Sequence, residues 1–182
     1  MFIQTELTPN PATLKFLPGR AVMQSGTANF TEAAAAARSP LAERLFALPG
    51  VTGIFLGTDF ITVTKDEASD WYQLKPAILG AVMEHFTAGR PVMLDTAQEA
   101  PVASEDDDEI VVQIKELLET RVRPAVAQDG GDIIFHDFAD GIVYLHMQGS
   151  CSGCPSSTAT LKAGIENMLR HYIPEVQAVQ AV

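Results

Sequence analysis

The stretch DIIFHDFADGIVYLHMQGSCSGCPSSTATLKAGIENMLRHYIPE, Asp132–Glu175, decides the fold of the second half of this chain. It holds two runs of β-branched and aromatic residues on either side of Asp140–Gly141, a pair typical of the tight turn of a β-hairpin. A short loop with both cysteines of the chain comes next. A helix is then predicted from Pro155 to about Tyr172, because proline is favoured at the first helical position, and Pro174 ends it.

Apolar residues at helical spacing predict another helix before the hairpin and define the buried side of both helices. The earlier helix carries on its apolar stripe Ile110, Ile114, Leu117, Leu118 and Val122. The later helix carries Leu161, Ile165, Met168, Leu169 and Tyr172. The glycines of DGG at 129–131 end the earlier helix, and VQAVQAV at 176–182 predicts a final strand. The order α-β-β-α-β is that of a small α+β domain.

The first part of the chain predicts a second small α+β domain. Short strands are expected at 2–7 and 13–17, followed by a helical region over 31–48 that Pro40 divides. The stretch GVTGIFLGTDFITVTK at 50–65 predicts a hairpin that turns at Gly57–Asp59. A last helix is expected to run up to Gly89, with a buried face formed by Trp71, Leu74, Ile78, Val82 and Phe86.

Residues 95–108, DTAQEAPVASEDDD, separate the two halves. The stretch has no hydrophobic period, contains a proline and ends in a block of acids, which is typical of a linker. We therefore predict two small α+β domains joined by an acidic linker. The first domain covers residues 1–94, the flexible linker 95–106, and the cysteine-containing domain 107–182.

The formal net charge of −11 limits the classes of partner. Such a chain repels phosphate backbones and anionic lipid headgroups, so we expect neither nucleic acid nor a membrane surface among its partners. Two cysteines are too few to staple 182 residues as a disulfide scaffold. The first residues, MFIQTELTPNP, have no basic region followed by an apolar stretch, which indicates a cytoplasmic and most simply bacterial protein. The same sequence also suits a mature mitochondrial protein whose leader has been removed.

Cys151 and Cys154 lie at the predicted start of the helix that begins at Pro155. Backbone N–H groups at a helix start are unpaired and carry partial positive charge, so a thiolate is expected to form there more readily than in a free cysteine. Gly149 and Gly153 remove side-chain bulk from the loop, and the neighbouring serines offer hydrogen-bond donors. The loop therefore suits a compact anionic object such as a thiolate, a metal–thiolate or an iron–sulfur cluster.

Several interpretations of this C-x-x-C pair remain open from the residues alone. The glycines, serines and proline around the pair disfavour two incidental cysteines near a turn. A dithiol oxidoreductase fits the helix start, but such proteins usually carry the motif after the first strand of a βαβ unit, whereas here it follows an antiparallel hairpin. Zinc or an iron–sulfur cluster normally takes four protein ligands, and this chain supplies two cysteines.

Symmetry offers a solution to the missing ligands. Two copies of the chain, each providing Cys151 and Cys154, would complete a four-cysteine site across a two-fold axis. A site shared between subunits is open to disassembly and ligand exchange, which suits a carrier. The histidines do not stand at paired ligand spacing with the cysteines, and each is interpreted as a surface or strand residue: His85, His136, His146 and His171.

The motif DGGD at Asp129–Asp132 has two interpretations. A helix-ending turn, in which a glycine adopts positive φ, is favoured over a position near a bound cluster or at a dimer seam. The sequence has no Ser-His-Asp order, phosphate loop or dinucleotide fingerprint, and its acids suggest no general acid–base pair. We therefore expect a protein that is not an enzyme.

The run from Arg123 to Val176 resembles the NifU-like C-terminal domain of Nfu iron–sulfur cluster carriers, through RP…DGGDI, GIVYLHMQGSCSGCPSS and TLKAGIENML. The first part is similar to the N-terminal domain of the same family, through TPNPATLKF, GVTGIFLGTDFITVTK and LKPAILGAVMEHF. The likeness covers nearly the whole chain apart from the acidic linker. The cysteines show no departure from the family pattern.

This resemblance implies a function. Nfu proteins bind a labile cluster, typically 4Fe–4S, between the C-x-x-C motifs of two subunits and deliver it to apo-enzymes. Carried over, Cys151 and Cys154 are the cluster ligands, the chain forms a homodimer on cluster binding, and its partners are upstream cluster scaffold proteins and apo iron–sulfur targets. A set of four cysteine ligands also suits a 2Fe–2S cluster. The N-terminal domain is implied to recognise targets or upstream partners.

Overall fold

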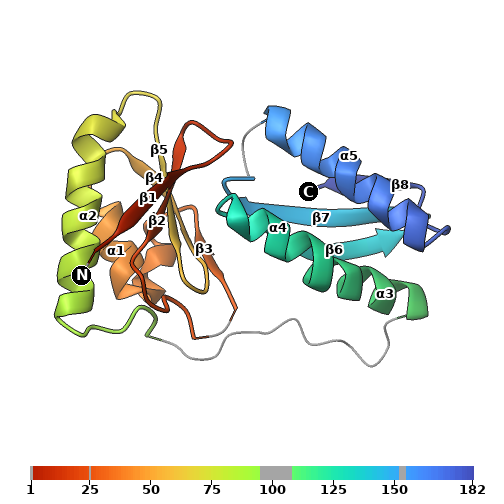
Figure 1. Cartoon of the computed structure of the whole chain (residues 1–182), viewed down its shortest axis with the longest axis horizontal. Coiled ribbons are helices and arrows are strands. Elements are labelled where there is room, and N and C mark those ends of the chain that lie inside the picture. Colours follow the sequence, from red (N-terminus) through yellow and green to blue (C-terminus); the bar gives the residue numbers. More distant parts are fainter. Residues whose placement is uncertain (1, 25, 95–107, 152–154) are drawn as a thin grey trace. The chain divides into compact units, whose positions relative to one another are not determined.

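The computed structural model describes residues 2–24, 26–94, 108–151 and 155–182, and for 155–157 it describes the backbone only. The chain divides into two compact units, Met1–Ala100 and Pro101–Val182, and each has its own sheet (Figure 1). Each unit also has its own hydrophobic core. Both units combine helices with a mainly antiparallel sheet, so the predicted pair of small α+β domains is confirmed.

The first unit is built on an antiparallel sheet with the strand order β1-β2-β5-β4-β3. Its strands are β1 (Gln4–Leu7), β2 (Thr13–Leu17), β3 (Ala28–Phe30), β4 (Val51–Leu56) and β5 (Ile61–Lys65). The strand pair β1–β2 and the hairpin β4–β5 are the ones that the sequence predicts. The sequence does not predict β3, because three residues are too few to establish a period of two.

The helices of the first unit are η1 (Ala35–Arg38), α1 (Pro40–Phe46) and α2 (Trp71–Thr87). Ser39 caps α1, because its hydroxyl accepts a hydrogen bond from the N–H of the third helical residue at 3.1 Å. Pro40 occupies the first position of the same helix. The carboxylate of Asp70 accepts from the N–H of Tyr72 at 3.0 Å and caps α2, which runs through Pro76. One missing hydrogen bond near its start does not end this helix.

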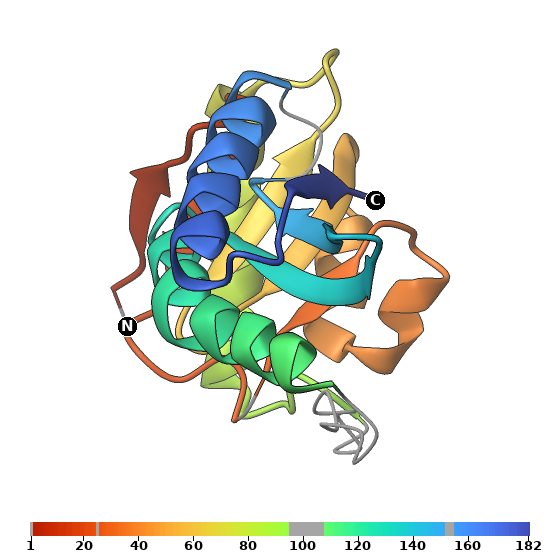
Figure 2. The ribbon, with the colours of Figure 1, turned by 90° about the vertical axis from the view of Figure 1, so that its right-hand side faces the viewer.

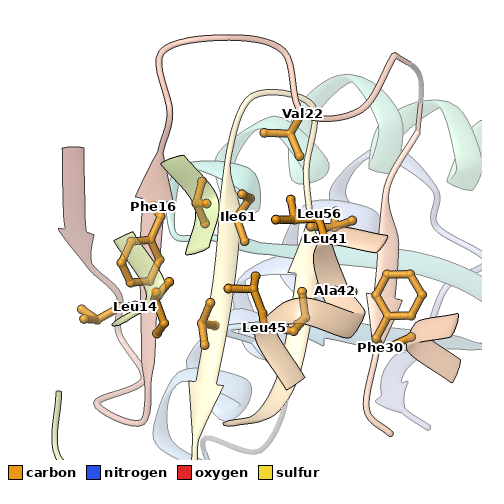
Figure 3. Packing of buried hydrophobic residues seen from close by; sticks show 14 of the residues in the cluster. Leu14, Phe16, Val22, Phe30, Leu41, Ala42, Leu45, Leu56 and Ile61 are labelled. Carbon is orange, nitrogen blue, oxygen red and sulfur yellow. The ribbon is translucent and has the colours of Figure 1, made fainter. Parts of the chain in front are cut away.

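The core of the first unit lies between the sheet and its two α-helices. Leu14 and Phe16 of β2, Ile61 of β5, and Leu41 and Leu45 of α1 meet in one cluster (Figure 3). The predicted stripe of α2 closes the same core, where Leu74, Ile78, Val82 and Phe86 are buried and Trp71 is partly buried. Each fully buried aliphatic or aromatic side chain contributes roughly 1.5–3 kcal/mol relative to exposure.

The second unit supplies the cysteine loop. Its elements are α3 (Glu109–Leu117), η2 (Leu118–Val122), α4 (Arg123–Gln128), β6 (Gly131–Ala139), β7 (Ile142–Gly149), α5 (Pro155–Tyr172) and β8 (Ala178–Ala181). This order is the predicted α-β-β-α-β. β6 and β7 form an antiparallel hairpin whose turn residues, Asp140 (φ 53°) and Gly141 (φ 76°), both have the positive φ that the predicted turn requires. β8 pairs with β7 in parallel.

One continuous helical run extends through α3, η2 and α4, and the five residues of η2 are wound as a π-helix. Pro124, in the first turn of α4, has no N–H, and in a regular α-helix its ring would clash with the carbonyl four residues earlier. A wider turn just before the proline relieves this clash, so the run continues to Gln128. The apolar stripe does not distinguish one widened turn from regular helix, and the sequence therefore does not predict it.

Both helical runs of the second unit cover the same face of its sheet (Figure 2). Val143, Leu145 and Met147 alternate along β7 and therefore point to one face. They share a single core with Ile114 of α3 and Leu169 of α5.

The predicted apolar stripes of these helices are confirmed except at Tyr172. This side chain is 47% exposed, and Ile173, which follows it, is 1% exposed and enters the core instead. The residue after the last helical turn no longer follows helical spacing, so a stripe extrapolated to the helix end selects the wrong neighbour. The ring of Tyr172 lies 5.0 Å from the guanidinium of Arg121, a cation–π contact between α5 and η2.

Candidate functional site

Cys151 lies just past the end of β7, where the strand enters the cysteine loop. Gly149 ends the strand with a φ of 66°, a left-handed conformation that favours glycine. Cys151 is 7% exposed and packs with the core of the second unit. Cys154 lies outside the described residues, and its predicted place beside the helix start stays a prediction. α5 begins at Pro155, directly after Cys154, as the sequence predicts.

Hydrogen bonds from two directions hold the backbone around Cys151. The hydroxyl of Ser150, which is 1% exposed, donates to the carbonyl of Asp129 at 2.5 Å. The N–H of Ser150 donates to the carbonyl of Gly130 at 3.3 Å. From the other side, the hydroxyl of Thr158, in the first turns of α5, donates to the carbonyl of Cys151 at 3.0 Å. The start of the cysteine loop is thus tied both to the DGGD turn and to the helix that follows it.

The DGGD motif itself lies against the thiol. Gly130 has a φ of 79° and forms the helix-ending turn that the sequence favours. Gly131 begins β6 and pairs with Gly149 across the hairpin. A Cβ placed on Gly131 would lie 2.6 Å from Cys151 Sγ, a distance that real side chains do not adopt. Gly130 therefore turns the chain, as the sequence favours, and Gly131 borders the thiol, while a place near a cluster or at a dimer seam stays a prediction.

A buried ion pair anchors this turn to the helical run before it. Arg123 Nε and Nη2 donate to the two carboxylate oxygens of Asp132, each at 2.9 Å, and Nη1 donates to Glu119 at 2.5 Å. The side chain of Asp132 is 5% exposed and that of Arg123 is 24% exposed. The hydrogen bonds to Asp132 raise the pKa of Arg123 above its ordinary value, against the opposing effect of burial. A two-pronged pair of this kind fixes orientation as well as distance.

The topology around the loop differs from the sequence-based argument about redox pairs. The β6–β7 hairpin is antiparallel, as predicted, but β7, α5 and β8 form a parallel crossover. The cysteine loop therefore does lie between the first strand and the helix of a βαβ unit. In open sheets, crevices at the carboxyl ends of such strands commonly bind ligands. The prediction that the topology disfavours a dithiol oxidoreductase is therefore wrong.

Other ligand-type side chains do not gather into a metal site in the described part of the chain. No three His, Cys, Asp or Glu residues of residues 2–24, 26–94, 108–151 and 155–182 come together there. His136, His146 and His171 are exposed, as expected for surface residues. His85 differs from that expectation, because it is 1% exposed inside the first unit and donates from Nε2 to the carbonyl of Pro91 at 3.0 Å. Among the described residues, no helix combines the length and apolarity needed to cross a membrane.

The comparison with family models covers both units. Residues 3–89 match the model described as scaffold protein Nfu/NifU N terminal, and residues 114–180 match the NifU-like domain. The chain is 54% identical to the human protein named NFU1 iron-sulfur cluster scaffold homolog, mitochondrial, over 100% of this chain and 72% of that protein. The chain belongs to the Nfu/NifU family. The resemblance stated from the sequence motifs is confirmed.

A plant relative of this Nfu/NifU chain agrees with that assignment. The chain is 53% identical to NifU-like protein 4, mitochondrial, of Arabidopsis thaliana, with 99% of this chain and 65% of that protein covered. It thus spans about two thirds of the length of the Arabidopsis relative. The human and Arabidopsis relatives both carry the word mitochondrial in their names, so they give no support to the predicted bacterial cytoplasm. A solution structure titled NifU-like protein from Saccharomyces cerevisiae has a TM-score of 0.48 and 28% identity, and it covers 52% of this chain and 86% of that one.

Sequence reasoning about this Nfu/NifU chain considered a functional place for DGGD but favoured a simple turn, and it missed the Arg123–Asp132 pair. A signal for Gly131 is present in the motif, because one positive-φ turn needs a single glycine and DGGD supplies two. The ion pair joins residues nine positions apart on different elements. No local spacing rule predicts such a contact.

Proposed function

We propose that this chain is an iron–sulfur cluster carrier. Two copies hold one labile cluster, of the 4Fe–4S type, between their Cys151 and Cys154 thiolates and transfer it to apo-proteins. A 2Fe–2S cluster is the variant that the same four ligands accept. The role is binding and transfer, with the cluster as cargo, and it involves no catalytic residue.

The observation that carries this proposal is the prebuilt position of Cys151 in a chain of this family. Its backbone is held by Thr158 and, through Ser150, by the DGGD turn, so little conformational entropy is lost when the thiol binds a metal. The donor set also fits the cargo, because thiolates are the ligands of iron–sulfur clusters. The names of the human and Arabidopsis relatives, an iron-sulfur cluster scaffold homolog and a NifU-like protein, point the same way.

Transfer follows from the shared site. Each subunit supplies two of four ligands, so separation of the subunits exposes half of the coordination sphere to incoming thiolates. Thiolates of the target replace Cys151 and Cys154 one after another, and each displaced cysteine takes up a proton. A chain with all four ligands would hold its cargo more firmly and release it less readily.

The remaining assignments concern the parts of the chain and its partners. We assign residues 1–94 to recognition of targets or upstream scaffold proteins, 95–106 to a linker, and 107–182 to cluster binding. The protein works in a reducing compartment that builds clusters, either a bacterial cytoplasm or the interior of a mitochondrion. Its partners are a second copy of itself, upstream cluster scaffolds and apo iron–sulfur proteins. With a net charge of −11, it does not bind nucleic acid or a membrane surface.

The first experiment is anaerobic reconstitution followed by gel filtration, with iron and absorbance measured across the eluted peak. The proposal expects a broad absorption band near ~400 nm and about four irons per dimer. Cys151→Ala and Cys154→Ala are each expected to abolish retention of iron, while Gly164→Ala, which changes a residue of α5 far along the helix from the loop, retains it. Colourless wild-type protein, or iron retained by Cys154→Ala, would overturn the ligand assignment.

A dithiol redox function is the second candidate, and the βαβ placement of the loop favours it. It predicts a reversible disulfide between Cys151 and Cys154 within one monomer and turnover of a disulfide substrate with a reducing system. Insulin reduction by the apo-protein tests this function directly. Structural zinc is distinguished by metal analysis, since zinc would remain bound in air without visible absorption.

A further inference from the structure

We propose that Gly131 is a positioning residue for Cys151, because the space that a side chain would fill at the head of β6 is the space that the thiol occupies. This inference rests on the proposed function for its effect on cluster binding. The contact between the two residues belongs to the apo-protein and is tested there independently.

Gly131 is required for its small size and not for its backbone conformation. Gly130 has positive φ, whereas Gly131 does not. An alanine therefore suits the backbone of residue 131, but its Cβ would lie 2.6 Å from Cys151 Sγ. The next atoms that this Cβ would meet are the carbonyl oxygen of Gln148 at 3.0 Å and the amide nitrogen of Cys151 at 3.2 Å. The thiol is thus the closest obstacle and the only one of the three on a rotatable side chain.

Hydrogen bonds hold the backbone on both sides of Gly131. Its neighbour Asp132 is held by two hydrogen bonds from Arg123, and the carboxylate also accepts from the N–H of Ile133 at 2.8 Å. Ser150 is bonded to the carbonyls of Asp129 and Gly130 on the other side. An added methyl group at residue 131 is therefore accommodated mainly by rotation of Cys151 about its single χ1 angle. Gly131→Ala is therefore expected to fold, with the thiol of Cys151 rotated out of its wild-type position.

Alanine in place of Gly164 provides the matched control. This glycine lies in α5 of the same unit, and apart from its chain neighbours and the adjacent backbone of its own helix a Cβ there would meet no atom within 4 Å. Gly164→Ala adds the same methyl group in open space and improves helix propensity. It is expected to leave the thiol, the iron content and the spectrum unchanged.

A double-mutant cycle on the apo-protein tests the contact itself. Gly131→Ala is expected to lower the Tm of the second unit by roughly 5–10 °C, as overpacking does in a small domain. In a Cys151→Ala background the same change is expected to lower this Tm by less than about half of that shift. Sγ is then gone, and only the two backbone atoms crowd the methyl group. Equal shifts in both backgrounds would show that Gly131 does not act on the thiol.

The reactivity of the Cys151 thiol distinguishes a rotated side chain from a loss of stability alone. In a Cys154→Ser background, the rate of Cys151 alkylation by iodoacetamide is measured in native apo-protein. Rotation away from the core is expected to raise this rate by about tenfold in Gly131→Ala, since the wild-type thiol is nearly buried. A rate that equals that of Gly164→Ala would overturn the proposal.

The final measurement is iron retained per dimer after anaerobic reconstitution and desalting. Gly131→Ala, with an unchanged far-UV circular dichroism spectrum, is expected to lose most of the iron that wild type and Gly164→Ala retain. Wild-type iron content and absorption in Gly131→Ala would overturn the positioning role. If wild type itself retains no iron, the proposed function fails, and the cycle and the alkylation rate still decide whether Gly131 positions the thiol.

Discussion

The hydroxyl of Thr158 holds the backbone of Cys151 through a hydrogen bond to its carbonyl. Thr158→Val keeps the shape of the side chain and removes the donor to the Cys151 carbonyl. The loss of one partly buried hydrogen bond is expected to cost about 1 kcal/mol and to speed the loss of iron to a chelator. Urea unfolding and chelation kinetics measure the two effects. Thr158→Ser retains the hydroxyl and should behave like wild type, so a defect in both variants would contradict the role of the bond.

His85 makes the stability of the first unit depend on pH. Burial lowers its pKa below the ordinary value, Arg44 and Arg90 lower it further, and the hydrogen bond to the Pro91 carbonyl opposes the shift. As pH falls through about 6.5, the unfolded imidazole takes up a proton that the folded one does not, so stability is lost below that pH. The loss is at most about 1.4 kcal/mol per pH unit.

Urea unfolding at pH 7.5 and 5.5 measures this dependence in wild type and in His85→Gln. The glutamine amide retains a donor for the Pro91 carbonyl but does not titrate. The variant is therefore expected to lose less stability than wild type between the two pH values. Identical losses in both proteins would mean that the acid sensitivity comes from other groups.

Between elements, the Arg123–Asp132 pair joins α4 to β6 beside the thiol. Asp132→Ala leaves a half-buried guanidinium whose remaining carboxylate partner, among the described residues, is Glu119. Loss of a buried partner costs roughly 3–5 kcal/mol, and the partial exposure of Arg123 reduces this to about 2–3 kcal/mol. Glu119→Gln removes the other carboxylate, which is 65% exposed, and is expected to cost less than about 1 kcal/mol. Urea unfolding of the second unit compares the two, and equal losses would contradict the anchoring role of Asp132.

The elements also separate what local sequence patterns predict from what they do not. The DG turn of the β6–β7 hairpin, the start of α5 at Pro155 and the stripe of α3 follow from rules within a few residues, and all are confirmed. No such local rule predicts the parallel pairing of β8 with β7, because residues 36 positions apart, such as Ile142 and Ala178, meet there. Contacts of this range depend on the packing of the whole unit.

The same division applies to the site. The cysteines and the helix start are local motifs, and they are visible in the sequence. The approach of Gly131 to Cys151 joins two chain segments across the hairpin and depends on strand register. Register is set by the whole pattern of buried side chains, so this contact emerges only with the fold.

For the whole molecule, two separate cores predict two separate unfolding transitions. The single tryptophan, Trp71, lies in the first unit, so its fluorescence reports that unit alone, whereas circular dichroism reports both. We expect the two signals to give different midpoints in urea, because the units have independent cores. Coincident midpoints in wild type and in Asp132→Ala would contradict independence, since that variant weakens only the second unit.

The position of β8 has a consequence for the order of events during translation. Every strand of the first sheet precedes residue 66, so the first unit has all of its core strands before any part of the thiol site leaves the ribosome. The second sheet is an incomplete hairpin until Ala178–Ala181 has emerged, and until then the cysteine loop has no finished βαβ unit around it. The first unit of a nascent chain can therefore fold while the sheet that leads to Cys151 is still incomplete, and the cluster loading that we propose would follow synthesis instead of accompanying it.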